Sequence, residues 1–282
     1  MINFIVINRK RILLIIKTVE TKQTKGIYYL TLAMKANLPI TIQRISSDEN
    51  IELAYQQLCR GWANKGDNHD CWHLRFHWQK IKPQIQQLLR SGDYYLSPCK
   101  AVKVEEHSIG FSCKEWCAED ALVLKVLTNV LTEAIKPHLS SHCKHLKGNG
   151  GAKQAVIHTF TQAKRLSSEY TFVLKSDVKS YYASMNHSLL MSQFERYVSD
   201  DAVLKLLRQF LNHLDDVNGD LFECTRGIGK GSSLSPLIGA LYLDELDKIL
   251  ADYAQHVGAV YIRYMDDWLF YVIPAGSFAT LC

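Results

Sequence analysis

The sequence lacks the patterns typical of a membrane protein or a disulfide scaffold. Its 282 residues hold no apolar run of the roughly 20 residues that a bilayer-spanning helix needs, and the apolar N-terminal stretch is interrupted by Arg9-Lys10-Arg11. No small-residue cleavage site follows that stretch, so we expect no signal peptide. Eight cysteines are scattered without a CxxC pair, which indicates a reducing, cytoplasmic compartment.

Internal repeats and low-complexity segments are also missing, and the length indicates about two domains. Net charge is only +5, but it is unevenly spread. Residues 1–176 carry 25 Lys and Arg against 14 Asp and Glu, whereas residues 177–282 carry 8 against 14. A basic front half favours a polyanionic partner and an acidic back half favours metal ions, with ordinary surface variation as the alternative.

Two adjacent acids stand out in the stretch Tyr264-Met265-Asp266-Asp267. The residues on both sides are β-branched and aromatic, which predicts two strands with these four residues at a hairpin tip. The two charges repel, and burying them unpaired would cost several kcal/mol. A divalent cation would offset both costs; a solvated turn is the alternative, because Asp is common in turns.

Two further stretches have the composition of functional loops. The segment Tyr170–Lys175 predicts a strand that ends at Ser176-Asp177. Later, a glycine-rich loop runs from Arg226 through Lys230 and Gly231. Ser235 as N-cap and Pro236 at the first helical position then predict a helix that runs to about Ala251. A flexible loop before a firmly started helix suits contact with a nucleotide or a template.

A second glycine-rich stretch, His145–Lys153, is basic. Its exposed backbone N–H groups, with Lys147 and Lys153, could hold phosphate. It is not a Walker A sequence, because no Lys-Ser/Thr pair closes it, and an ordinary loop is an equally good interpretation.

Residues 1–45 are strand-like and lack motifs. From Ser47 onward, apolar spacing predicts helices over most of the remaining chain, with one basic strand that contains Lys100 and Lys103. A polar turn is predicted at 215–220 around Asn218-Gly219. The predicted helices are 48–59 (capped by Ser47), 78–89, 118–135, 187–198 and 200–214.

The order of three motifs resembles the catalytic palm of reverse transcriptases, and is close to the bacterial group II intron-like kind. The motifs are Asp177-Val178-Lys179-Ser180-Tyr181-Tyr182, Lys230-Gly231-Ser232-Ser233-Leu234-Ser235-Pro236 and Tyr264-Met265-Asp266-Asp267. The resemblance covers roughly residues 49–273. It implies an α+β right-hand polymerase with helical fingers and an antiparallel-sheet palm. We expect an N-terminal extension at 1–46, a basic fingers-like region at 47–168 and an incomplete palm at 169–282.

The resemblance also implies a chemistry, which is nucleotidyl transfer to a primer 3′-hydroxyl. Asp177 and Asp266 are expected to ligate two Mg²⁺ ions, with Mn²⁺ as a substitute, and the carbonyl of Val178 to add a ligand. Asp267 is expected to be more peripheral. The implied partners are an RNA template, a DNA or RNA primer and deoxynucleotides.

Other roles carry over by position. Tyr182 stands where the family packs an aromatic under the incoming sugar and excludes a 2′-hydroxyl; a core tyrosine is the alternative. Met265 is expected to line the primer end and the nucleotide. Lys230 departs from the family, which mostly has glutamine before the glycine that is here Gly231. The remaining candidates are Lys100, Lys103 and Lys114 for the triphosphate, and Lys147, Lys153, Ser235 and Pro236 for nucleic acid.

The largest departure lies at the end of the chain. Only 15 residues follow Asp267, whereas the family continues with the last palm strands, the primer grip and a helical thumb. We therefore expect weak, poorly processive synthesis. The alternatives are a truncated remnant that only binds nucleic acid, and an RNA-templated RNA polymerase, against which Tyr182 argues.

Overall fold

The computed structural model describes residues 2–8, 39–106, 109–146, 151–165 and 172–272. The side chains of residues 2–8, 101–113, 162, 163, 165, 172 and 272 lie outside this description. The chain forms two compact units that interleave in sequence. The sheet unit combines the N-terminal strand with residues 138–181 and 239–272, and the helical unit combines residues 39–137 and 182–238. The predicted α+β class is confirmed.

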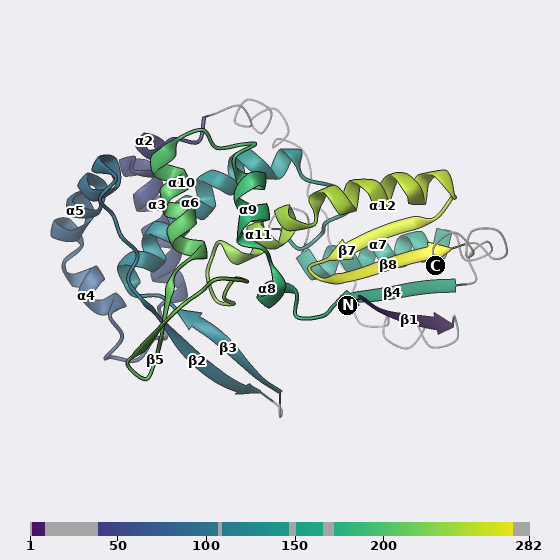
Figure 1. The fold of residues 1–282 in the computed structure, drawn as a ribbon, viewed down its shortest axis with the longest axis horizontal. Coiled ribbons are helices and arrows are strands. Elements are labelled where there is room, and N and C mark those ends of the chain that lie inside the picture. The colour runs from purple at the N-terminus through teal and green to yellow at the C-terminus, as the bar shows by residue number, and fades with distance from the viewer. Residues whose placement is uncertain (1, 9–38, 107–108, 147–150, 166–171, 273–282) are drawn as a thin grey trace. The chain divides into compact units, whose positions relative to one another are not determined.

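The sheet unit is built on four antiparallel strands in the order β1-β4-β8-β7 (Figure 1). The strands are β1 (Ile2–Asn8), β4 (Phe172–Val178), β7 (Val260–Tyr264) and β8 (Asp267–Val272). The predicted hairpin is therefore present as β7 and β8. β1 lies at one edge and pairs with β4 along its whole length, from Ile2 opposite Val178 to Asn8 opposite Phe172.

Helices cover both faces of this sheet. On one face α12 (Asp244–His256) packs its apolar side against a core that contains Leu174, Tyr261 and Phe270. On the other face α7 (Gly151–Arg165) lies over residues of β7 and β8, including Ile262 and Leu269. The connecting segment 140–145 runs along the outer edge of β7, where the Arg263 N–H donates to the carbonyl of His142 at 3.0 Å. That contact covers an edge that would otherwise expose backbone donors.

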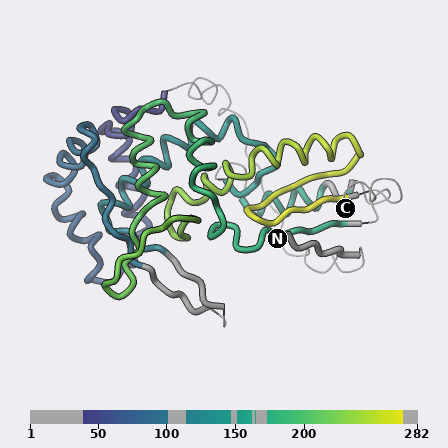
Figure 2. The backbone as a smooth tube through the Cα atoms, in the orientation of Figure 1, coloured from purple at the N-terminus to yellow at the C-terminus, as the bar shows by residue number. Residues whose placement is uncertain are grey.

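The helical unit packs around α6, a helix that the sequence predicts with the same bounds. Its buried residues, such as Leu122 and Val126, occur on nearly every turn and side, so it is the central helix of this unit. The tube in Figure 2 shows the same path of the backbone. The helices assigned wholly to this unit are α2 (Ile42–Ile45), α3 (Asp48–Gly61), α4 (Cys71–Phe76), α5 (Trp78–Ser91), α6 (Ala118–Ile135), α9 (His187–Phe194) and α10 (Asp201–Leu211).

A second sheet in the helical unit has the order β3-β2-β5-β6. Its strands are β2 (Cys99–Glu106), β3 (Ile109–Glu115), β5 (Leu214–Val217) and β6 (Asp220–Glu223). The polar turn predicted over 215–220 is wrong in extent, because residues 214–217 form a strand. Only Asn218 and Gly219 form the turn, both with positive φ (59° and 95°), which suits a two-residue hairpin.

Other predicted elements also need correction. The helix expected from Ser235 to about Ala251 is two helices, α11 (Ser235–Tyr242) and α12, separated at Leu243. Acidic residues in the first turn of α12 favour a new helix start there, because carboxylates stabilise a helix N-terminus. The loop expected through Lys153 already turns helical at Gly151. Two short helices, α8 (Tyr181–Ser184) and η2 (Lys136–His138), complete the described elements.

None of the helices in the described ranges is long and apolar enough to cross a lipid bilayer.

Candidate active site: a carboxylate hairpin

The pairing of β4 with β8 sets the two predicted carboxylate positions side by side. The last pair in the register is Ser176 opposite Trp268, and one more step sets Asp177 across from Asp267. Neighbouring strands lie about 4.8 Å apart. Asp177 lies at the end of β4 as predicted, and pairing with β1 extends this strand by one more residue, to Val178.

The tip of the hairpin is shorter than the predicted four residues. Tyr264 and Asp267 still pair with each other, so only Met265 and Asp266 form the loop. Met265 has φ +55°, the left-handed conformation that two-residue hairpin loops require at their first position. This tight loop carries Asp266 next to the strand pair that holds Asp177 and Asp267.

The candidate site contains three carboxylates, and one of them pairs with a lysine. The Lys175 Nζ lies 2.8 Å from Asp267 Oδ1, and the two side chains are 38% and 46% exposed. Because side chains alternate along a strand, Lys175 and Asp177 share a face of the sheet. A set of carboxylate oxygens on two adjacent strands, with a backbone carbonyl at Val178, fits the hard oxygen ligands that divalent cations prefer. All three acids are partly buried as whole residues, although the side chain of Asp267 is 46% exposed.

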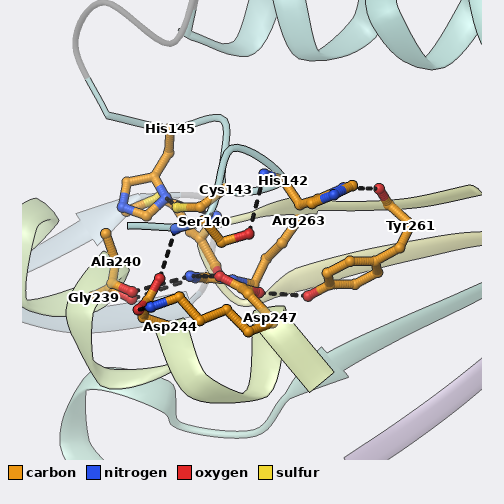
Figure 3. A network of polar contacts seen from close by, with 12 residues as sticks. Ser140, His142, Cys143, His145, Gly239, Ala240, Asp244, Asp247, Tyr261 and Arg263 are labelled. Carbon is orange, nitrogen blue, oxygen red and sulfur yellow. Dashed lines mark hydrogen bonds and ion pairs between the residues drawn. The ribbon is translucent and has the colours of Figure 1, made fainter. Parts of the chain in front are cut away.

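The hairpin is backed by a buried arginine that the sequence analysis missed. Arg263 is 0% exposed and forms an ion pair with Asp247 of α12, which is also fully buried (Figure 3). The hydroxyl of Tyr261 donates to the same carboxylate at 2.6 Å. Burial by itself would lower the pKa of Arg263, but the hydrogen bonds that Arg263 donates to the Asp247 carboxylate outweigh it and raise that pKa. An arginine inside an otherwise apolar strand was the available signal, because a buried charge needs a partner.

The glycine-rich loop lies in the helical unit and is packed against Lys114. The backbone N–H of Lys114 donates to the carbonyl of Lys230 at 2.8 Å. A Cβ at Gly229 would lie 1.9 Å from the Cγ of Lys114, and one at Gly231, where φ is +105°, would lie 2.8 Å from the Lys114 carbonyl oxygen. Lys114 therefore lies too close to both positions for a residue with a Cβ to replace either glycine without a shift. The side chain of Lys230 is exposed, as a contact to nucleotide or template requires.

Ser235 does not act as the predicted helix cap. Its hydroxyl donates to the carbonyl of Gly229 at 2.8 Å, and the side chain is 3% exposed. Ser235 therefore closes the glycine-rich loop from inside, whereas Pro236 next to it is exposed.

Lys114, a candidate for gripping phosphate, is already engaged. Its ammonium pairs with Asp215 of β5, whose carboxylate also lies 3.0 Å from the Nε2 of His213 and accepts from the Cys99 thiol at 3.2 Å. Three ligand types of a metal site thus meet here, with ligand atoms within 4.8 Å of one another. Burial and then Asp215 raise the pKa of Cys99 to about 12, which disfavours a metal-binding thiolate. We therefore interpret the cluster as a network of polar groups that satisfy one another.

The other predicted residues are spread over both units. Tyr182 is half-buried, and its carbonyl accepts from the N–H of Ile228 at 2.9 Å, so it adjoins the glycine-rich loop. Lys100 is exposed near the start of β2, and Lys153 is exposed on α7. The side chain of Lys103 and the whole of Lys147 lie outside the described residues.

Comparison with known proteins gives one family over most of this region. The family described as "Reverse transcriptase (RNA-dependent DNA polymerase)" matches residues 121–273. This match covers more than half of the chain and includes all three motifs.

Individual relatives are distant. The chain is 22% identical over 175 residues to the Putative COX1/OXI3 intron 1 protein of Saccharomyces cerevisiae, covering 60% of this chain and 20% of that protein. It is 25% identical over 207 residues to the Group II intron-encoded protein LtrA of Lactococcus lactis subsp. cremoris, covering 70% and 33%. Protein YkfC of Escherichia coli strain K12 is 31% identical over 81 residues, covering 28% and 21%. The chain therefore spans about a fifth to a third of these relatives' lengths.

Solved structures give a weaker likeness. A chain of a partial Cas6-RT-Cas1–Cas2 complex matches with a TM-score of 0.47 and 18% identity, covering 82% of this chain and 38% of that one.

Proposed function

Because this chain belongs to the reverse transcriptase (RNA-dependent DNA polymerase) family, we propose that it carries the catalytic region of an RNA-directed DNA polymerase. The activity would be transfer of deoxynucleotides to a primer 3′-hydroxyl on an RNA template. The observation that supports this most is the β4–β8 register, which pairs Ser176 with Trp268. Continued by one residue, this register brings Asp177 opposite Asp267, beside the two-residue loop that carries Asp266. Similarity to intron proteins favours a group II intron-like mobile element as the source.

Reverse transcriptases generally use divalent metal ions, and we propose two Mg²⁺ here, with Mn²⁺ as a substitute. The ions would activate the attacking hydroxyl and stabilise the leaving oxygen. Asp177 and Asp266 would hold both, and the carbonyl of Val178 would add a ligand. Asp267 would stay peripheral, consistent with its ion pair to Lys175.

We propose further roles in substrate recognition for residues of the family's motifs. Tyr182 would exclude a 2′-hydroxyl on the incoming nucleotide, Met265 would line the primer end, and the Lys230-Gly231 loop would contact the nucleotide. Further contacts to phosphate or template are proposed for Lys100, Lys103, Lys147, Lys153 and Pro236. The predicted contact at Ser235 is not proposed, because its hydroxyl is buried and donates to Gly229.

The proposed division of labour follows the family. Residues 47–168 would act as fingers and 169–282 as palm, while 1–46 would form an extension. The scattered cysteines favour a reducing, cytoplasmic location.

Primer extension on an RNA template tests the proposed function. The full chain with Mg²⁺ and deoxynucleotides should extend the primer, and Asp266→Asn should abolish extension. Asp252→Asn, an exposed acid on α12, is the matched control and should retain it. RNA binding without extension, unchanged by Asp266→Asn, would instead support a remnant that only binds nucleic acid. Equal incorporation of ribonucleotides would contradict the role given to Tyr182.

A further inference from the structure

The loop that carries Asp266 depends on an unfavourable backbone conformation. Met265 has φ +55°, and a non-glycine residue in this region is strained. Such strain, which is of the order of a few RT, persists only where the surroundings hold it. The position of Asp266 therefore depends on what holds Met265.

Both backbone groups of Met265 are held by side chains from outside the loop. The Arg263 Nη1 donates to the Met265 carbonyl at 2.7 Å. On the other side of the same residue, the Met265 N–H donates to the Nδ1 of His145 at 3.2 Å. These two contacts act on the peptide groups that flank Met265, one of which leads directly into Asp266.

The guanidinium of Arg263 is itself held by several hydrogen bonds. Its Nε and Nη2 donate to the two oxygens of Asp247 at 2.6 and 2.5 Å. Nη1 also reaches the carbonyl of Gly239 at 3.3 Å, and Nη2 that of Ala240 at 3.2 Å (Figure 3). Together with the Met265 contact, these bonds use all five N–H donors of a guanidinium. A lysine, with one ammonium and no planar fork, could not make this set of contacts.

His145 is also positioned by the sheet unit. The segment that carries it is hydrogen-bonded to both backbone groups of Arg263 in β7. The Arg263 N–H donates to the carbonyl of His142, and the Arg263 carbonyl accepts from the N–H of Lys144 at 2.9 Å. At its start, the Ser140 N–H donates to the carboxylate of Asp244 at 2.6 Å. The acceptor for the Met265 N–H is therefore anchored to the same strand and helix as Arg263.

We propose that Arg263 and His145 are positioning residues of the active site. They clamp Met265 in its left-handed conformation and so present the Asp266 carboxylate to the divalent metal. The metal part of this inference rests on the proposed function, whereas the clamp itself does not.

Hydrogen exchange on the full chain tests the clamp without any metal. In Arg263→Lys, and in His145→Phe, which keeps a ring but removes the acceptor, amide exchange in the peptide spanning 262–270 should accelerate by about tenfold. Arg208→Met is the matched control, because it removes an exposed ion pair with Glu195 that has no contact with the clamp residues, and it should leave this peptide unchanged. If Arg263→Lys does not fold, His145→Phe decides alone. Unchanged exchange in the folded variants would overturn the clamp.

Mn²⁺ titration followed by electron paramagnetic resonance tests the link to the metal. Each clamp variant should bind Mn²⁺ about tenfold more weakly than the unsubstituted chain. Adding Met265→Gly should restore most of this loss, because glycine adopts a positive φ without strain. Tight binding that is unaffected by the clamp variants would overturn the positioning role. Failure of the unsubstituted chain to bind Mn²⁺ would contradict the proposed function, while the exchange result would still decide the clamp.

Discussion

The hairpin of the sheet unit and the glycine-rich loop of the helical unit are each held by a residue that also forms an ion pair, Arg263 and Lys114, but in different ways. At the hairpin, Arg263 and Asp247 are 0% and 1% exposed, and the guanidinium reaches the backbone of the loop directly. At the glycine-rich loop, the Lys114 and Asp215 side chains are 13% and 19% exposed. There the loop is held by the stem and backbone of Lys114, and the charge points away to Asp215.

This difference matches what each loop would have to do. A guanidinium with all its donors engaged fixes a strained peptide, which suits carboxylates that must share metal ions. Lys114 packs its stem and backbone against Gly229 and Gly231 and so positions the glycine-rich loop. The side chain of Lys230 stays exposed, where a substrate could reach it. Arg263 thus holds the hairpin loop by hydrogen bonds, whereas Lys114 holds the glycine-rich loop by close packing.

The largest expected effect is on the arginine pair. Arg263→Met leaves the Asp247 charge buried without its partner, so we expect the free energy of unfolding to fall by about 3–5 kcal/mol. Arg208→Met, which removes an exposed ion pair with Glu195, should cost less than about 1 kcal/mol. Both are measured by urea unfolding. A loss no greater than that of Arg208→Met would show that the buried pair does not secure the hairpin.

A double substitution sharpens this result. Arg263→Met combined with Asp247→Leu removes both charges and should recover much of the lost stability, because the main cost is the orphaned carboxylate. The hairpin should nevertheless remain mobile in hydrogen exchange, since the contact to Met265 is still missing.

The next effect concerns the glycine-rich loop. In Gly229→Ala the new methyl group would meet the Lys114 stem at 1.9 Å, so we expect a loss of about 1–3 kcal/mol from overpacking. Gly61→Ala, in α3 with nothing within 4 Å of the new carbon, should be neutral or slightly stabilising. Thermal unfolding compares them. Equal melting temperatures for the two variants would contradict the close packing of Lys114 on the loop.

The smallest effect is a pH dependence confined to the Lys114 network. Burial lowers the pKa of His213, although its hydrogen bonds to the Phe210 carbonyl and to Asp215 oppose this. As pH falls below about 6.5, the unfolded chain takes up a proton that the folded chain resists, so stability should fall by less than about 1 kcal/mol per pH unit. Arg263 keeps its charge throughout this range.

Unfolding measured from pH 7 to pH 5 should therefore show a slope that His213→Phe reduces. An identical slope in that variant would place the titrating group elsewhere.

The sequence predicted the elements that carry a local pattern. The helix 118–135, the Ser47-capped helix and the β7–β8 hairpin all follow from apolar spacing or from turn residues. The break at Leu243 escaped this reasoning, because apolar positions continue across it. The two ion pairs were also missed, since Arg263 lies 16 residues from Asp247, and Lys114 lies about a hundred residues from Asp215. Periodicity reports which face is buried, but it does not report which charge meets which.

We propose that Asp177 of β4 and Asp266 of the hairpin bind the same metal ions. Mn²⁺ titration of the full chain, followed by electron paramagnetic resonance, measures whether they do. We predict that Asp177→Asn and Asp266→Asn each abolish tight Mn²⁺ binding, while Asp252→Asn binds as the unsubstituted chain does. Tight binding that survives Asp177→Asn with unchanged affinity would contradict the account.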